Sequence, residues 1–265
     1  MPKILPLFPN DINTFVDLFC GACTVGIYIK ANSIICNDLI NYIIELFNVW
    51  KDKDLKSINR YIDCCIVENN LSPLDKKSFE EFRIKYNTSK NIEDLFVLIC
   101  YSFNFQIRFN NSQQYNSSFG KEASTMNNNI RNNINKFVNE MHSKNIIFQC
   151  GDFKDFNFKP LGINDFVYCD SPYLISGAVY QDGKRGFKGW NRQDDIDLCK
   201  ILDILSERNI KFAMSNMLES KGNKNETLIE WSKKYKIHNL SMNYGGSNYQ
   251  RKSIGKDVEV LITNY

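Results

Sequence analysis

Three short apolar runs in this chain each lead to an aspartate, and this pattern restricts the fold more than any other feature. The run FVDLF carries Asp17 at its centre, the run 34–36 is closed by Asn37 and Asp38, and FVYC is followed by Asp170. Such runs predict short buried strands. Helix-like segments separate most of the strand candidates, which favours an α/β fold with a mostly parallel sheet and helices on both faces.

The second half of the chain supplies the other strand candidates. They are residues 145–153, 165–170, 210–216, 236–242 and 257–265, and an amphipathic helix is predicted from about 193 to 208. Only the polar stretch 243–256 separates the last two candidates. We therefore predict that these two strands form an antiparallel hairpin at the edge of the sheet.

The length of 265 residues fits one α/β domain that carries a smaller insertion. We predict a main domain from residues 1–50 and 136–265 and an insertion from 51–135. Residues 51–90 are charged and compatible with helices, whereas asparagine supplies ten of the 33 residues in 103–135. On composition alone, this polar stretch is either a solvated loop or a surface that forms hydrogen bonds with a partner.

Cysteine usage and charge describe the expected environment. The chain has nine cysteines, no signal peptide and no run of 18 apolar residues, which predicts a reduced, cytoplasmic protein without a membrane segment. Cys20 and Cys23 form one C-x-x-C, but with two histidines in the chain we expect no metal site. The net charge of +3 permits a polyanionic partner without requiring one.

The segment between Asp17 and Asp38 has the order of a nucleotide-binding half: strand, small-residue turn, helix, strand, acid. The small residues are Gly21, Ala22, Thr24 and Gly26, and the segment lacks the spacing G-x-G-x-x-G. Asp38 is placed to accept hydrogen bonds from the ribose hydroxyls of an adenosine-containing cofactor. Each strand-end acid also has a structural interpretation as a helix cap, and D-S-P-Y alone is an ordinary turn sequence.

The order of the motifs is more specific than any one of them. The motifs FVDLFCGA, NDLINYIIELF, CGDFKDF and DSPY, in this order, resemble those of the Dam-type DNA adenine methyltransferases, the D12 or α class, with T-even phage members among the most similar. The resemblance extends over nearly the whole chain, from SFNFQIRFNNSQQYNSSFGK in the middle to the closing EVLITNY. It implies a Rossmann-like S-adenosylmethionine-dependent methyltransferase fold with a small helical and loop insertion for target recognition.

The same resemblance implies the function and the partners. We expect methyl transfer from S-adenosylmethionine to the N6 amine of an adenine flipped out of double-stranded DNA, at GATC or a related short site. A restriction endonuclease of the same system is an expected partner in function, without a direct complex.

The resemblance also assigns the site residues. Asp170, Ser171, Pro172 and Tyr173 are expected to be catalytic. The Asp170 carboxylate and a carbonyl of Ser171 or Pro172 would accept the two N–H groups of the amine, and the Tyr173 ring would stack on the flipped base. The expected cofactor-binding residues are Lys3, Asp17, Phe19, Gly21, Ala22, Asp38, Asp152, Phe153 and again Asp170.

DNA contacts are expected in three places. The residues in the middle segment are Arg108, Asn110, Tyr115, Ser118 and Lys121, whose types suit base-edge readout. A basic group after the catalytic motif is expected to bind phosphates and comprises Lys184, Arg185, Lys188 and Arg192. The stretch before the last strand adds Arg251 and Lys252.

Two departures from the family pattern keep other interpretations open. Ser171 stands where the family usually has a proline in D-P-P-Y, and the N-terminal segment lacks the family's glycine, with Lys3 the candidate for its lysine and Ala22 in place of a second turn glycine. One alternative is therefore a catalytically weak or inactive DNA-binding relative. Another is methylation of a different planar amine, such as cytosine N4 or a glutamine side chain.

Overall fold

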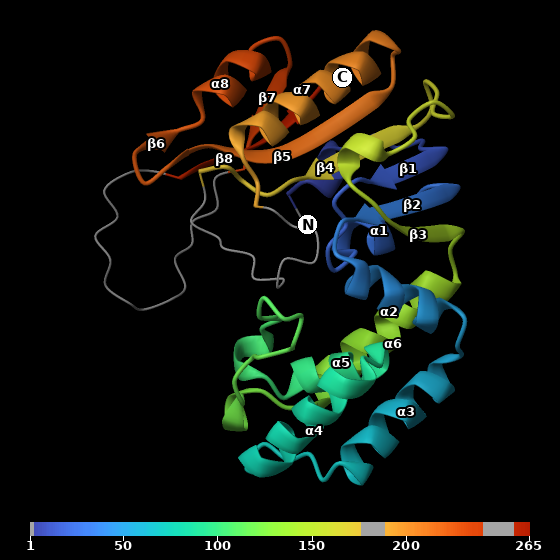
Figure 1. Ribbon diagram of the computed structural model, residues 1–265. Helices are drawn as coiled ribbons and strands as arrows, with labels where there is room; N and C mark the ends of the chain where they lie inside the picture. Colours follow the sequence, from blue (N-terminus) through green and yellow to red (C-terminus); the bar gives the residue numbers. More distant parts are fainter. Residues whose placement is uncertain (1–2, 176–188, 241–256) are drawn as a thin grey trace. The chain divides into compact units, whose positions relative to one another are not determined.

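The computed structural model describes residues 3–175, 189–240 and 257–265 (Figure 1). The chain divides into two compact units, and the described residues 3–39, 145–175, 189–240 and 257–265 make up the first. Residues 40–144 belong to the second. The predicted insertion 51–135 lies inside the second unit, and its independence as a domain stays a prediction.

The first unit is built on a mixed sheet. Its described strands are β1 (Thr14–Asp17), β2 (Ser33–Asp38), β3 (Ile146–Cys150), β4 (Phe166–Asp170), β5 (Lys211–Ser220), β6 (Asn223–Lys224), β7 (Lys236–Asn239) and β8 (Val258–Thr263). The order is β3-β2-β1-β4-β5-β8-β7, with β6 paired to β5. The pairs formed among strands β1 to β5 are all parallel, whereas β8 is antiparallel to both β5 and β7 and β6 is antiparallel to β5.

This topology confirms the predicted mostly parallel sheet with a C-terminal antiparallel hairpin. The hairpin strand β8 lies inside the sheet, because it pairs with β5 as well as β7, and β7 is the edge strand. The chain moves from β1 to β2 on one side and to β4 on the other, so β1 lies at the point where the strand order reverses. Ligands of open α/β sheets bind outside the carboxyl ends of the strands at such a point.

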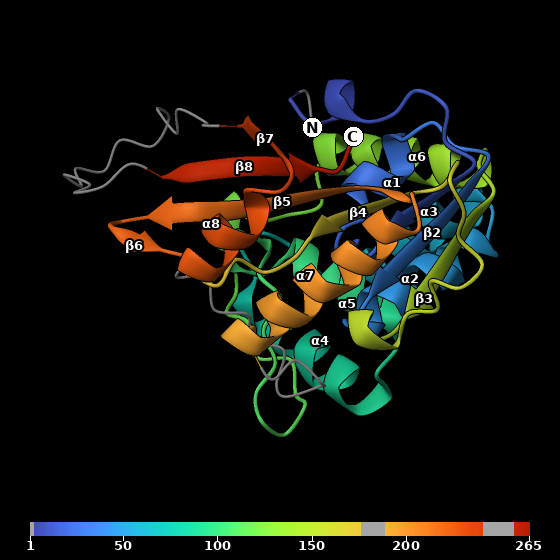
Figure 2. The same ribbon diagram turned by 90° about the horizontal axis from the view of Figure 1, so that it is seen from above.

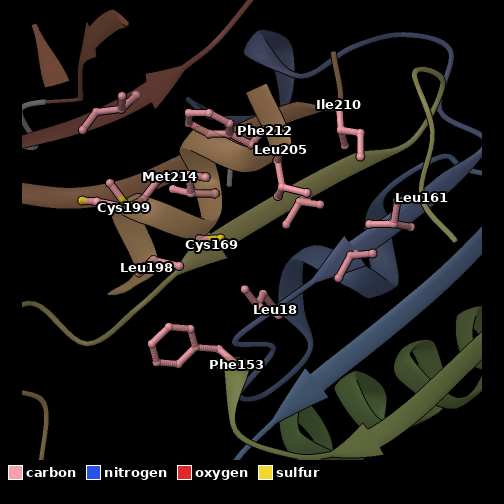
Figure 3. Packing of buried hydrophobic residues seen from close by; sticks show 14 of the residues in the cluster. Leu18, Phe153, Leu161, Cys169, Leu198, Cys199, Leu205, Ile210, Phe212 and Met214 are labelled. Carbon is pink, nitrogen blue, oxygen red and sulfur yellow. The ribbon is translucent and has the colours of Figure 1, made fainter. Parts of the chain in front are cut away.

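Successive side chains of the strands point to opposite faces of the sheet, and each face is covered by different elements. Helix α7 (Arg192–Glu207) runs along the face of β4 and β5, with α8 (Glu226–Ser232) beside it (Figure 2). Leu198, Leu202 and Leu205 of α7 belong there to one buried cluster with Val167 and Phe212. Figure 3 labels Leu198, Leu205 and Phe212 within this cluster. The opposite face carries the shorter α1 (Thr24–Tyr28), which packs against β1 and β2. On that face the rings of Phe8, Phe166 and Tyr168 also lie against one another.

The second unit is helical. Its long helices are α2 (Asn41–Lys51), α3 (Leu55–Glu68), α4 (Lys76–Ser89), α5 (Ile92–Cys100) and α6 (Asn128–His142). Helix α5 is almost wholly buried and packs against α2, α3 and α4. Aspartate or asparagine side chains cap the N-termini of α3 to α6, which fixes where these helices begin.

The asparagine-rich stretch 103–135 has two different structures. Residues up to 127 form irregular backbone with short 3-10 turns η2 (Phe103–Phe105) and η3 (Lys121–Ala123). From residue 128 onward the chain is helical, because Ile134, Val138 and Met141 recur at helical spacing and bury one face of α6. The loop interpretation was therefore wrong for the last eight residues of the stretch, whereas a surface that forms hydrogen bonds with a partner stays a prediction.

Candidate functional site

Three strand-end acids lie side by side at the carboxyl edge of the sheet. Asp17 ends β1, Asp38 ends β2 and Asp170 ends β4, and β1 pairs directly with the other two strands. The carboxylates interact electrostatically, since both Asp170 and Asp38 help to raise the pKa of Asp17. This strand order therefore places the three acids at one edge of the sheet.

The turn after β1 is held by hydrogen bonds from the neighbouring strand ends. The Gly21 amide donates to Asp38 Oδ2 at 2.7 Å, and Gly21 has φ +47°, a left-handed conformation that favours glycine. The buried Asn37 side chain donates to the carbonyls of Leu18 at 3.1 Å and Gly151 at 3.0 Å. Asn37 thus connects the loops after β1 and β3, and the sequence analysis missed this role.

Asp17 lies beneath this turn with an unsatisfied oxygen. Its Oδ2 accepts the Gly26 amide at 3.3 Å, while Oδ1 is buried without a hydrogen-bond partner among the described residues. The residue is 1% exposed, and burial, with the nearby Cys20 and Asp170, raises its pKa well above the usual value. A buried carboxylate with a spare acceptor oxygen is suited to bind a cationic ligand group, which would donate a hydrogen bond to it and balance its charge.

The small residue at position 26 is required by packing. A Cβ atom added to Gly26 would lie 2.6 Å from Cys36 Sγ and 3.0 Å from Cys23 Sγ. The two thiols themselves lie 3.2 Å apart, so the second cysteine of the C-x-x-C contacts β2. Among the residues that the structure describes, no group of three or more histidine, cysteine or acidic side chains is arranged to hold a metal ion.

An aromatic cluster borders the same edge. The ring of Phe19 lies 5.3 Å from that of Phe153 and 5.6 Å from that of Trp190, and Phe153 and Trp190 are 5.4 Å apart. The Trp190 indole donates to Asp195 Oδ1 at 2.6 Å, which fixes the ring. Phe19 and Phe153 were predicted to bind cofactor, whereas Trp190 was not, because its partners are distant in sequence. Asp152 caps η4 (Phe153–Asp155) through the Lys154 amide.

The D-S-P-Y motif follows β4 directly. Asp170 is exposed, whereas Ser171 is 2% exposed and its Oγ accepts from Asn216 of β5 at 3.4 Å. The Tyr173 hydroxyl lies 3.2 Å from Asp170 Oδ1 and 3.2 Å from Glu259 Oε1 of β8. Although part of the Asp170 surface is exposed, the protein atoms packed around its carboxyl partly desolvate it and raise its pKa to about 6. The Tyr173 hydrogen bond opposes this rise and the Glu259 charge adds to it.

The middle segment forms a small hairpin in the second unit. Isolated bridges join Phe109 to Tyr115 and Ser102 to Phe119. Four of the five residues predicted to bind DNA here are exposed, and they are Arg108, Asn110, Ser118 and Lys121. The fifth, Tyr115, is buried, and its hydroxyl hydrogen-bonds with Ser102 Oγ at 2.7 Å and donates to the Gln106 carbonyl at 2.9 Å. In this conformation Tyr115 holds the hairpin together.

Helix α4 fixes this hairpin through one amide side chain. Asn87 Nδ2 donates to the Tyr115 carbonyl at 3.0 Å, and Asn87 Oδ1 accepts the Tyr115 amide at 2.7 Å. The side chain therefore pairs with Tyr115 as a neighbouring strand would. Next to the hairpin, Phe103 and Phe105 are 50% and 41% exposed, and Asn104 and Phe105 have left-handed backbone. Two exposed rings in a strained turn were not expected from the sequence.

The remaining predicted residues lie elsewhere or outside the description. Lys3 donates to the Leu240 carbonyl at 3.1 Å, and Ala22 is exposed in the turn. Arg192 begins α7, where its Nε donates to Thr227 Oγ1 at 3.0 Å. The other basic residues predicted to bind DNA lie outside the described residues, namely Lys184, Arg185, Lys188, Arg251 and Lys252.

Comparison with known proteins identifies the group to which this site belongs. Residues 1–245 match the family described as D12 class N6 adenine-specific DNA methyltransferase. The chain belongs to this family. It is 46% identical to the type II methyltransferase M.FokI of Planomicrobium okeanokoites and 42% identical to the modification methylase StsI of Streptococcus sanguinis, over 99% of this chain in both cases.

These D12-class relatives differ from this chain in length. The chain spans 40% of the length of each of those two enzymes. It is also 22% identical to the DNA adenine methylase of Escherichia coli K12, over 84% of this chain and 76% of that protein. Among the described residues, no helix combines the length and apolar character that crossing a membrane requires.

Proposed function

We propose that this chain transfers the methyl group of S-adenosylmethionine to the N6 amine of adenine in double-stranded DNA. The observation that carries the proposal is the position of Asp170 and Tyr173 at the carboxyl end of β4, beside the turn that Asp38 closes and the spare oxygen of Asp17. A base-binding carboxylate and a cofactor turn then lie at the same edge of one sheet.

The proposed cofactor fits the residues present. The unpartnered Asp17 Oδ1 would accept from the ammonium group of the methionine part, and Asp38 would accept from ribose hydroxyls. The rings of Phe19 and Phe153 would lie against the apolar parts of the molecule. When bound, S-adenosylmethionine supplies an electrophilic methyl group on a cationic sulfur.

The chain's own residues would activate the amine. The lone pair of adenine N6 is delocalised into the ring, so the amine is a poor nucleophile. Asp170 would accept one N–H, a carbonyl of Ser171 or Pro172 would accept the other, and both contacts favour a pyramidal nitrogen with its lone pair available. The ionised form of Asp170 is required for this, so methyl transfer is expected to fall as the pH drops below about 6.

One experiment tests the proposed activity. The protein is incubated with S-adenosylmethionine labelled in the methyl group and with unmodified double-stranded DNA, and the methylated base is identified after digestion. N6-methyladenine supports the proposal, whereas label in N4-methylcytosine or in protein would select a different amine. DNA binding without any transfer would select the inactive DNA-binding alternative.

The recognition site, the biological role and the location are part of the same proposal. We infer a short site such as GATC or a related sequence, read by the hairpin of the second unit. Similarity to proteins named modification methylases supports a restriction–modification system with a cognate endonuclease, acting without a direct complex. Action on intracellular DNA implies a cytoplasmic protein.

Replacing Asp38 by alanine is expected to weaken cofactor binding and leave DNA binding nearly unchanged. The carboxylate both holds the Gly21 amide and would contact the ribose, so its loss removes two hydrogen-bond acceptors from one region. Loss of hydrogen bonds to a charged group corresponds to a roughly tenfold or larger rise in Kd. Calorimetry with S-adenosylhomocysteine measures the effect, and an unchanged Kd would leave Asp38 with only its structural role at the turn.

Replacing Arg108 by alanine is expected to relax sequence choice at one base pair. Arginine in an exposed hairpin of the second unit is the residue type that reads guanine edges, and one such contact contributes about 1 to 3 kcal/mol of discrimination. Mapping the methylated adenines in cellular DNA measures the effect, and an unchanged motif would rule out base readout by Arg108.

Arg192 is the matched comparison for Arg108. We assign its side chain, which is tied to Thr227, to DNA phosphates. Its replacement by alanine should weaken binding to all sequences alike, reduce the slope of affinity against salt by about one, and leave the methylated motif unchanged.

A further inference from the structure

Glu259 brings a second carboxylate to the hydroxyl group of Tyr173. The phenol oxygen lies 3.2 Å from Asp170 Oδ1 and 3.2 Å from Glu259 Oε1. The two acids come from β4 and β8, which are separated in the sheet by β5. This contact joins the catalytic motif to a strand that the site residues assigned so far do not include.

The backbone of Glu259 is held on both sides. It pairs with Met217 of β5, and the register of β5 and β8 shifts between Met217 and Glu219, as at a β-bulge. Its carbonyl accepts the Leu240 amide at 2.9 Å. Bulges re-aim side chains near functional sites, and the next residue, Val260, anchors β8 in the buried core. The carboxylate is therefore presented from a rigid element, whereas Tyr173 lies in a loop.

The number of hydrogen atoms limits what the three groups can do together. A phenol hydroxyl carries one hydrogen, so Tyr173 can donate fully to only one of two ionised carboxylates at a time. The other carboxylate interacts favourably with the phenol oxygen only when it is protonated and donates. When Asp170 accepts an N–H of the substrate amine, Glu259 is the second carboxylate within hydrogen-bond distance of the Tyr173 hydroxyl and can accept from it.

Resting on the proposed methyl transfer, we propose that Glu259 is a positioning residue for it. Glu259 accepts the Tyr173 hydroxyl when Asp170 turns to the adenine amine, and so keeps the Tyr173 ring in place without occupying Asp170. The negative charge of Glu259 also favours the proton on Asp170 before the base enters. Both effects act through Tyr173 and Asp170, and neither requires Glu259 to contact the substrate.

The charged and titratable groups around Asp170 come from several elements. Glu259 faces it from β8, Asp17 from β1, Tyr168 from β4 itself and Tyr173 from the following loop. The acids among them all oppose ionisation of Asp170. Removing the charge of Glu259 should therefore favour the ionised form of Asp170 at lower pH.

The first test uses the conservative variant E259Q, which keeps an oxygen acceptor for Tyr173 and removes the charge. The pH dependence of kcat/KM for DNA is measured for wild type, E259Q and the matched control E219Q, a glutamate on the adjacent β5. The acidic limb of the profile should move to lower pH by about one pH unit in E259Q only. An unmoved limb in E259Q would overturn the electrostatic part of the inference.

The second test uses a rescue that a purely structural glutamate would not show. In E259A, the Tyr173 hydroxyl has lost its second acceptor and competes with the substrate amine for Asp170, so kcat should fall about tenfold. Removing that hydroxyl in E259A/Y173F should raise kcat several-fold above the value for E259A. Thermal melts of each variant show whether it is folded, and E259Q keeps the inference testable if E259A is not.

The two proposals fail in different ways. If the wild-type protein transfers no methyl group to adenine, the proposed function is wrong before any variant is compared. If the wild type is active but E259A/Y173F is slower than E259A, Glu259 does not act through the Tyr173 hydroxyl and the positioning role is wrong.

Discussion

Replacing Asp170 by alanine is expected to lower methyl transfer to DNA by about two to four orders of magnitude, the loss that follows removal of a positioned polar catalytic group. The carboxylate is the acceptor that would hold the adenine amine, and the neighbouring carbonyl cannot replace it because that carbonyl accepts the other N–H. Single-turnover transfer of labelled methyl, with DNA and cofactor saturating, measures the chemical step. A variant that keeps more than about a tenth of the wild-type rate would exclude the assigned role.

Loss of the fold is not expected to explain this result. The pKa of Asp170 is raised to about 6 by desolvation, with the Glu259 charge adding. A carboxyl whose pKa is higher in the folded than in the unfolded chain lowers stability once the pH exceeds its ordinary pKa. At pH 7.5, Asp170→Ala should therefore melt at or above the wild-type temperature. The matched variant Asp170→Asn keeps an acceptor oxygen but adds a donor, so it should also be slow.

The sequence predicted the parts of the site that depend on local pattern. A short apolar run that ends in an acid predicts a strand and its carboxyl end, and parallel pairing then brings Asp17, Asp38 and Asp170 to one edge. The structure supplies the strand order that completes this argument, because β1 pairs with both β2 and β4. No contact between distant side chains was needed to reach it.

The parts that were missed depend on contacts between distant segments. Asn37 is one polar residue in a strand, and its role arises only when the loops after β1 and β3 meet. Trp190 reaches the site from a loop before α7 that no quoted motif contains, and Glu259 opens the closing EVLITNY of β8, where the pattern shows a strand but not a contact with Tyr173. Composition alone did not indicate the start of α6, because exposed and half-buried asparagines surround Ile134, the first residue of its buried face.

In the hairpin of the second unit, too, the role of a residue in DNA recognition depends on contacts with distant segments that the sequence does not show. Residue type indicated Arg108 and Tyr115 equally, yet one is exposed and the other is a buried support for the hairpin. Tyrosine serves both roles because it has a large apolar ring and one polar group. Which role applies is decided by contacts with Asn87 of α4 and with Ser102, and neither residue was assigned a function from the sequence.

Replacing Asp17 by asparagine is expected to weaken cofactor binding and to stabilise the protein without cofactor. Burial raises the pKa of Asp17 well above its usual value, so the ionised carboxylate is unfavourable in the fold at neutral pH. Asparagine keeps the shape and removes the charge. It also removes the acceptor proposed for a cationic ammonium group, and Kd for S-adenosylhomocysteine should rise roughly tenfold to a hundredfold.

The pH dependence of the melting temperature separates this effect from a general change in packing. The stability gained in Asp17→Asn should be present at pH 7.5 and should shrink as the pH falls toward the ordinary pKa of aspartate, where the carboxyl is neutral in both states. Asp165 is the matched control, because its pKa is shifted in the opposite direction and its replacement should change stability in the opposite direction. Burial alone would raise its pKa, but hydrogen bonds from Gly162, Asn13 and Thr14 hold the pKa below the usual value.

Asp165→Asn should therefore lose stability at pH 7.5, and the loss should decrease only as the pH falls through the lowered pKa of Asp165. Calorimetry on the two variants gives the Kd for S-adenosylhomocysteine, and thermal melts of the same samples give the change in stability. If Asp17→Asn melts lower than wild type at pH 7.5, as Asp165→Asn should, then Asp17 is a structural acid. If Asp17 binds the cofactor, Asp17→Asn should instead melt higher than wild type at pH 7.5. The reason is that the carboxylate charge lowers the stability of the protein without cofactor and is neutralised by the cationic group of the bound cofactor.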